Sequence, residues 1–250
     1  MITPADVEAI ERATLNALPP LLLEEDDGWL LAANEGAVGR ANSVLALCAG
    51  HDPLIEKLER AIAFYRRQGL PPCFRLSPWS QPAGLEAILS AQGFVPDQPT
   101  DVMIADLATA LAALSGVEPA ERMAAPDDAW RAVFLGAGFD AAEGAKRAAT
   151  LARSQTSLFA RQQVDAETVA IGALGVGGDW AGVHGMRTAL AHRRRGLAAR
   201  VLKALIEGAA SQGVTRLFLQ VEADNTPAKS LYGRLGFERA WGYAYWRPVG

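Results

Sequence analysis

The sequence has few cysteines and no long apolar run, and each scarcity excludes a class of protein. Cys48 and Cys73 are the two cysteines of the 250 residues, and they lack metal-ligand spacing. Their apolar surroundings favour reduced core cysteines over a disulfide framework. No apolar stretch is long enough to span a bilayer, and the first residues lack the basic region and apolar core of a secretory signal. We therefore expect a cytoplasmic protein with no membrane segment and no metal site.

Positive charge is also in short supply. The chain has 24 Lys and Arg against 28 Asp and Glu, a net charge of -4, which argues against a general nucleic-acid binder. Hydrophobic residues make up 50% of the sequence, enough to bury a substantial core in one large domain or two small ones. Basic character is local and concentrates between residues 193 and 203.

That basic segment is a cationic turn directly ahead of an amphipathic helix. Residues 193–198 read Arg-Arg-Arg-Gly-Leu-Ala, and apolar residues then recur at helical spacing from Leu197. Unpaired N–H groups and the positive end of the helix dipole favour an anion, and Gly196 lets a ligand approach the backbone. Three arginines are ordinarily a solvated charge run, but the glycine and the helix favour a phosphate site.

The order of elements in the second half repeats that of the first. Gly69 and Gly93 are separated by nearly the same interval as Gly213 and Gly236. Each copy is predicted to contain, in this order, a helix, a strand, a short helix, a Gly-Phe pair and a last strand. In the first half these elements lie at 58–68, 73–76, 85–89, 93–94 and 102–104. In the second half they lie at 197–212, 217–221, 231–235, 236–237 and 243–246. The first copy has Asp52 where the second has Gly196. A carboxylate there satisfies the helix dipole and repels phosphate, so we expect one anion site, in the second half.

The boundary between the halves is expected near Val117, giving domains 1–117 and 118–250. Beyond it the patterns predict helices at 127–135 and 141–153 and strands at 157–162, 168–176 and 182–190. Gly177-Gly178-Asp179 is a strong hairpin signal between the last two of these strands.

Two motifs resemble the GNAT superfamily of acetyl-CoA-dependent N-acetyltransferases. Residues 193–198 fit its Q/R-x-x-G-x-G/A signature, and Asn225 to Phe237 resemble its second motif, with the family's step from Asn to Tyr232. The resemblance covers about 118–250 well, and the first half only in its helix, strand and Gly-Phe pattern. It implies an α/β (α+β) fold of tandem GNAT-like type, with mixed, mostly antiparallel sheets flanked by helices and a degenerate first copy.

The resemblance also assigns residues to acetyl-CoA. Backbone N–H groups of the turn would bind the pyrophosphate, and backbone groups of the strand before it would bind the pantetheine arm. Asn225 joins them as a ligand-binding residue, because Pro227 fits the first helical position and makes Thr226 the natural cap. The full cofactor set is Met186, Arg187, Thr188, Arg193, Arg194, Arg195, Gly196, Leu197, Ala198, Ala199 and Asn225.

Acetyl transfer from a thioester to an amine needs a proton acceptor for the amine and a stabilised thiolate. Tyr232 is the candidate general acid, with a packed core tyrosine as the alternative. Where some relatives have a glutamate base this chain has Gln220. Glu222 follows on the same strand face, and His184 shares a face with Met186 and Thr188, so both are candidates. The alternatives are a solvated strand-end carboxylate and a hydrogen-bonded strand histidine.

The sequence therefore predicts an N-acetyltransferase that moves an acetyl group from acetyl-CoA directly to a primary amine. The acceptor is a small molecule or a peptide, and the chain is a monomer or homodimer. An acyl-CoA-binding regulatory module without turnover is the alternative.

Overall fold

The computed structural model describes residues 2–36, 38–138 and 140–249 as alternating helices and strands. Before Val117 these are α1 (Pro4–Ala17), β1 (Leu22–Asp26), β2 (Trp29–Ala33), the 3-10 helix η1 (Gly39–Ala41), β3 (Val44–Ala46), α2 (Leu54–Arg67), β4 (Phe74–Leu76), α3 (Leu85–Ala91), β5 (Phe94–Asp106) and α4 (Leu107–Ala113). After it come β6 (Glu121–Met123), α5 (Asp128–Ala132), η2 (Val133–Leu135), α6 (Ala141–Ala152), β7 (Ser157–Val164), β8 (Glu167–Gly177), β9 (Trp180–Thr188), η3 (Leu190–His192), α7 (Leu197–Ala210), β10 (Arg216–Glu222), α8 (Thr226–Arg234) and β11 (Glu238–Pro248).

The described strands form one sheet of eleven in the order β1-β2-β3-β4-β11-β5-β10-β9-β8-β7-β6. Neighbours run antiparallel except for β3 with β4 and β9 with β10. Helix α7 packs on β7 and β8, and α1 packs on β8 and β9. The predicted α/β class, with a mostly antiparallel sheet flanked by helices, is confirmed.

The repeat is visible in the connections. Strands β1 to β3 lead through α2 to β4, α3 and β5, and β7 to β9 lead through α7 to β10, α8 and β11. In each copy the strand after the long helix pairs parallel with the strand before it. The helices and strands predicted from residue 197 onward are confirmed. Helix α1, the strands β1 to β3 and the short β6 were not predicted from the sequence.

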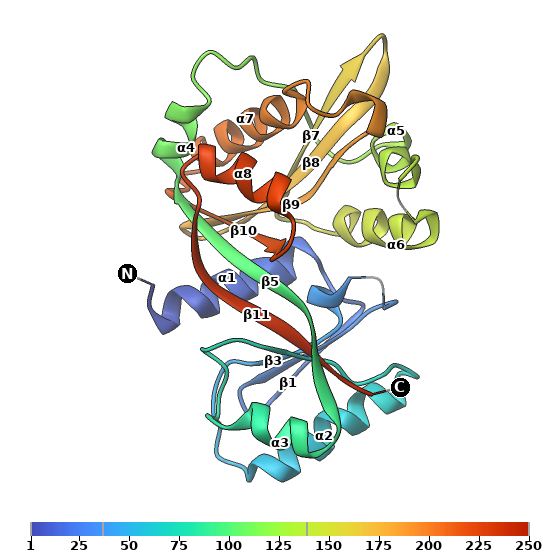
Figure 1. The fold of residues 1–250 in the computed structure, drawn as a ribbon, viewed down its shortest axis with the longest axis vertical. Helices are drawn as coiled ribbons and strands as arrows, with labels where there is room; N and C mark the ends of the chain where they lie inside the picture. Colours follow the sequence, from blue (N-terminus) through green and yellow to red (C-terminus); the bar gives the residue numbers. More distant parts are fainter. Residues whose placement is uncertain (1, 37, 139, 250) are drawn as a thin grey trace.

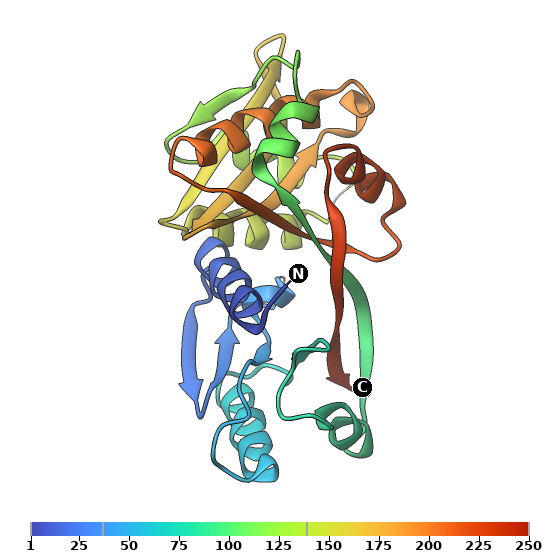
Figure 2. The same ribbon diagram turned by 90° about the vertical axis from the view of Figure 1, so that its left-hand side faces the viewer.

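Each half places its last strand beside the other half. Strand β5 lies between β10 and β11, and β11 lies between β5 and β4. Figures 1 and 2 show β5 and β11 running side by side from one lobe of the molecule to the other. The predicted boundary near Val117 falls between α4 and β6 and stays a prediction, because the sheet continues through both halves.

Helix α1 ties the beginning of the chain to the second half. A Cβ on Gly175 or Gly177 of β8 would lie 2.4 or 2.8 Å from the methyl groups of Ala17 and Ala13, so these glycines allow the helix to approach the sheet closely. Asp6 of α1 pairs with Arg216 of β10 at 2.6 Å. Its pKa is lowered to about 2, first by its bond with Thr3 and further by Arg216.

The core is divided between the lobes. One apolar cluster lies under α7 and another under α2, and α1 contributes Val7 and Ile10 to a third that includes aromatic residues of β9, β10 and β11. Cys48 and Cys73 are both unbridged; Cys73 is buried as expected, but Cys48 is exposed, so its assignment to the core was wrong. Among the described residues no helix is long and apolar enough to cross a membrane.

Candidate active site

The site begins where two parallel strands separate. Strands β9 and β10 pair from Trp180 and Arg216 as far as Val183 and Leu219, and the pairing ends there although both strands continue. Beyond that point β9 and β10 are not paired, and a strand at such a separation can pair through its backbone with an extended ligand. A cleft of about 570 Å³ opens at this separation.

A bulge in β9 shapes the cleft wall. The register between β8 and β9 shifts between Ile171 and Ala173, where β9 contains one extra residue. Gly185 adopts φ +61 at this position, a conformation that glycine reaches without strain. The extra residue also reverses the face on which the later side chains of β9 lie. His184 contacts Phe218, whereas Met186 packs against the cluster under α7, so the prediction that they share a face was wrong.

The cleft brings together six of the predicted residues, and the others lie outside it. On its walls are His184, Met186 and Arg187 of β9, Glu222 of β10, Asn225, and Tyr232 of α8. Thr188 ends β9 beyond the cleft. Residues 193–199 come after η3 and form the turn and the first residues of α7 rather than a wall of the cleft.

The turn has the geometry of a helix N-terminus that is open to a ligand. Gly196 caps α7 with φ +76, and Arg194 also has a positive φ of +60. The first helical bond runs from the N–H of Ala199 to the carbonyl oxygen of Gly196 at 3.1 Å. The N–H groups of Leu197 and Ala198 therefore precede the helical ladder and lie at the turn. This arrangement suits a phosphate group.

The equivalent position in the first half is filled by the chain itself. Asp27 of the β1–β2 turn accepts from the backbone N–H groups of His51 and Asp52 at 2.9 to 3.0 Å, ahead of α2. These bonds, Asp52 first, lower its pKa to about 2, and the buried Lys57 ammonium lies 3.1 Å away. A carboxylate does occupy this helix end, but it belongs to Asp27, because Asp52 turns to Arg60 instead.

Tyr232 has a buried ring that packs edge-on against Phe237, 5.8 Å between centroids. Burial raises the pKa of its hydroxyl to about 12, against smaller lowering effects of Arg187 and Arg40. The hydroxyl is therefore protonated at neutral pH. Tyr232 lines the cleft and belongs to the core at once, so the two interpretations of this residue are compatible.

His184 is almost completely buried, at 2% exposure, and both ring nitrogens lack a partner among the described residues. Burial, with a further contribution from Arg40, holds its pKa well below the ordinary value of 6.5. The imidazole is neutral at pH 7. The hydrogen-bonded strand histidine considered from the sequence is not what the structure has.

Asn225 is the helix cap, contrary to expectation. Its Oδ1 accepts from the N–H of Ala228 at 3.2 Å, and α8 begins at Thr226. The helix starts one residue earlier than predicted because Pro227 is tolerated at its second position, where no backbone donor is needed. The Asn225 amide still lines the cleft, so its NH₂ group remains the part that a ligand can reach.

Other residues that line the cleft come from segments that no sequence motif indicated. Arg40 of η1, Thr100 of β5 and Tyr243 of β11 line it. Arg40 donates to Oε1 of Gln220 at 3.3 Å, and Tyr243 donates to the same oxygen at 3.3 Å. Only the sheet order, which is non-local, brings these residues to β10, so no spacing in the sequence could reveal them.

Comparisons with known proteins agree with this geometry. Residues 4–246 match the model of a family described as "Probable histone acetyltransferase Rv0428c C-terminal". The uncharacterised N-acetyltransferase YobR of Bacillus subtilis (strain 168) is 29% identical over 240 residues, which cover 93% of this chain and 94% of that protein.

Solved structures share the fold at lower identity. A GCN5-related N-acetyltransferase from Kribbella flavida superposes with a TM-score of 0.68 at 17% identity, over 96% of this chain and 95% of that one. A tandem GNAT protein from the clavulanic acid biosynthesis pathway gives a TM-score of 0.63 at 15% identity, over 98% and 96%. Both cover the two halves together. The chain thus belongs to the Rv0428c C-terminal family of acetyltransferases and is an acyltransferase of the GNAT superfamily.

Proposed function

We propose that the chain transfers an acetyl group from acetyl-CoA directly to a primary amine of a small molecule or peptide. The observation that carries the proposal is the separation of β9 from β10 beyond Val183 and Leu219, beside the open end of α7. We expect the protein to work in the cytoplasm as a monomer or homodimer, with the degenerate first half shaping the acceptor side.

Two parts of acetyl-CoA, the pyrophosphate and the pantetheine arm, fit the turn and the strand β9. The pyrophosphate would bind at the turn, where Arg194 and Arg195 supply charge and the backbone from Gly196 to Ala199 supplies N–H groups. The pantetheine amides would pair with the backbone of β9 at Met186, Arg187 and Thr188, as an added strand does. Arg193 supports the turn by donating to the carbonyl oxygen of Thr188 at 3.3 Å.

We assign Tyr232 to stabilisation of the departing thiolate. Complete proton transfer from a group of pKa about 12 to a thiolate whose conjugate acid has a pKa of about 8.5 would cost roughly 5 kcal/mol. We therefore assign the hydroxyl the role of a hydrogen-bond donor to the sulfur as charge develops. Backbone N–H groups of β9 near Met186 would polarise the thioester carbonyl.

For the amine proton we favour Glu222 over His184. Glu222 is an exposed carboxylate at the cleft edge, where it can accept a proton directly or through water. His184 is held neutral with its pKa well below 6.5, so it is a weak base. Its unpartnered ring nitrogens suit it to hydrogen-bond the acceptor instead.

The test is release of free thiol from acetyl-CoA in the presence of a panel of primary amines. We expect at least one amine to give steady release with formation of the N-acetyl product. Binding of acetyl-CoA without thiol release from any amine in the panel would contradict transfer.

A further inference from the structure

The cleft contains four arginines, and three of them are already engaged. Arg147 pairs with Glu143 at 3.2 Å, and Arg247 pairs with Asp97. Arg187 stacks over the Phe134 ring at 5.4 Å and donates to the carbonyl oxygen of Met186. The charge of Arg147 and of Arg247 is therefore paired with a carboxylate, and the orientation of Arg187 is fixed by its contacts.

Arg40 is different. Among the described residues it has no carboxylate within ion-pair distance, and it donates to the neutral amide of Gln220 at 3.3 Å. A guanidinium has five N–H donors, so one long bond to an amide leaves most of them open to the cleft. Its positive charge acts on His184 and Tyr232, whose pKa values it lowers, which places it close to the proposed reacting groups.

The surroundings hold Arg40 in this position. A Cβ on the preceding Gly39 would lie 2.7 Å from the ring of Tyr245, so η1 packs directly on β11. Asn42 at the end of η1 accepts from the N–H of Asn34 at 2.9 Å, and Asn34 donates to Thr150 of α6 at 3.0 Å. Gln220 is fixed in turn, because its Nε2 donates to Thr14 at 3.1 Å. The guanidinium is thus presented to the cleft by contacts with both halves.

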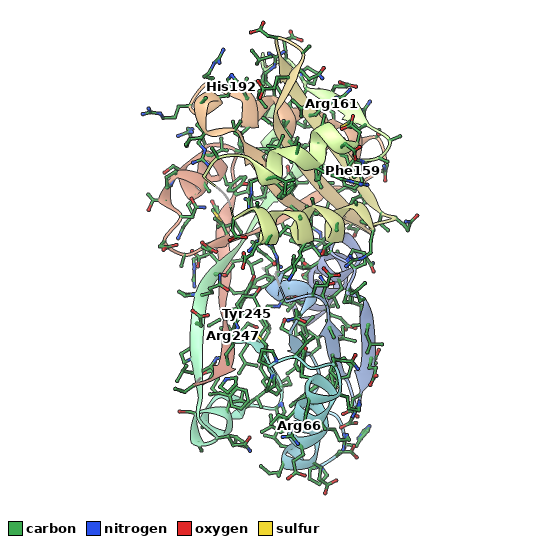
Figure 3. The ribbon with its side chains drawn as sticks, turned by 90° about the vertical axis from the view of Figure 1, so that its right-hand side faces the viewer. Arg66, Phe159, Arg161, His192, Tyr245 and Arg247 are labelled. Carbon is green, nitrogen blue, oxygen red and sulfur yellow. The ribbon has the colours of Figure 1, made fainter. Side chains whose placement is uncertain are left out.

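Arg40 also lies on the side of the cleft away from the turn. It follows Gly39, which packs against the ring of Tyr245, whereas His192, next to the turn, lies well apart from Tyr245 in Figure 3. An anion at Arg40 is therefore distinct from the pyrophosphate expected at the turn. The fork of a guanidinium matches a carboxylate by two parallel hydrogen bonds.

We propose that Arg40 binds a carboxylate of the acceptor, so that the acceptor is an amino acid or another amine that carries a carboxylate. The inference rests on the proposed acetyl transfer and adds the chemical class of its substrate. It also gives the first half a task, which is to supply the residue that determines specificity for the reaction in the second half.

The first experiment measures binding, so that it does not depend on turnover. N-acetyl amino acids and their carboxamides, which mimic the product with and without the charge, are titrated calorimetrically into the full chain. At least one acid should bind about tenfold or more tightly than its carboxamide, as a charged hydrogen bond predicts. Arg40→Gln should abolish that preference. An equal affinity for every acid and its amide, or a preference that survives Arg40→Gln, overturns the proposal.

Arg66→Gln is the matched control. Arg66 is exposed on α2, and Figure 3 places it near the lower end of the molecule, away from Tyr245 and Arg247. It should retain the preference for acids. Equal melting temperatures of the two variants exclude unfolding as the cause, and Arg40→Lys, which restores the charge without the fork, should recover part of the affinity.

Kinetic measurements test the role of Arg40 separately from acetyl transfer itself. They also distinguish a carboxylate on the acceptor from a carboxylate on the acyl group of the donor. With an accepted amino acid, Arg40→Gln should raise KM about tenfold or more with a much smaller change in kcat. If no amine releases thiol, transfer fails while the calorimetric result still decides the role of Arg40. If instead Arg40→Gln weakens succinyl-CoA relative to acetyl-CoA and leaves the acids unaffected, the carboxylate belongs to the donor and the proposal is wrong.

Discussion

A single oxygen atom distinguishes the two roles of Tyr232. Its ring packs against Phe237, and the residue also lines the cleft. Tyr232→Phe keeps the ring and removes the donor to the thiolate. We expect turnover to fall by ~10²-fold or more, with the affinity for acetyl-CoA preserved, as measured by thiol release and calorimetry.

The control for this substitution is Tyr65→Phe. Tyr65 is also buried, in the first half, and its hydroxyl donates to the carbonyl oxygen of Ala32 at 2.7 Å. Its loss should cost about 1 kcal/mol of stability and leave turnover unchanged. Unchanged turnover in Tyr232→Phe would remove that hydroxyl from the mechanism.

Functional residues that belong to local motifs could be predicted from the sequence, and those that do not could not. Gly196 and Tyr232 could be found because each stands at a fixed step within one helix and the turn before it. Arg40 and Asp27 could not, since each reaches its partners only through the folded sheet. The cap of α8 was assigned to Thr226 instead of Asn225 because a proline fits either of the first two helical positions.

Helix α7 offers an internal comparison between its two ends. Gly196 precedes it with φ +76 and Gly213 comes after it with φ +81, and a Cβ at either position would meet nothing within 4 Å. Each change to alanine should therefore cost a similar stability, about 1 kcal/mol, from left-handed strain. Gly196→Ala should also weaken acetyl-CoA binding about tenfold, because a methyl group intrudes where the phosphate approaches the backbone.

Gly213→Ala carries the same strain at the end of the helix that no ligand is expected to touch. Its acetyl-CoA affinity, measured by the same calorimetry, should equal that of the unmodified chain. If the two alanine variants bind acetyl-CoA equally well, the turn at residues 193–196 is not the phosphate site.

Whole elements were predictable where the pattern was long and periodic. The helix from Leu197 and the hairpin at Gly177-Gly178-Asp179 formed as expected, since both signals are local. Strands β1 to β3 were missed because they are short, and β2 and β3 are buried throughout, which removes the alternation that identifies a half-buried strand. The bulge in β9 was also not predicted, because assigning side chains to alternate faces assumes a regular strand.

Strands β5 and β11, which each half places beside the other half, are linked through Asp101. This buried carboxylate on β5 bonds Lys229 of α8 at 2.5 Å and Arg239 of β11 at 2.6 Å. Burial alone would raise its pKa, but these two bonds hold it below the usual value. Asp101→Ala should destabilise the whole chain by about 2 kcal/mol, measured by urea denaturation.

The pH dependence of this contribution is set by the direction of that shift. A folded pKa below the unfolded one stabilises the protein above the ordinary aspartate value and loses that effect as pH falls through the lowered pKa. The difference between the unmodified chain and Asp101→Ala should therefore be complete at pH 7 and shrink in acid. Asp97→Ala, on the same strand but with an exposed carboxylate, should cost well under 1 kcal/mol. Equal losses in the two variants would show that Asp101 does not link the two strands.

The exchanged strands also determine when the molecule can assemble during its synthesis. One of the two neighbours of β4 is residues 244–246 of β11, which are synthesised long after β4 itself. Until then the first half has an open sheet edge at β4, and β5 waits for β10, which is made more than a hundred residues later. The two halves, although they repeat one plan, cannot mature one after the other. The sheet of the first half is complete only after β10 and β11 of the second half have been made.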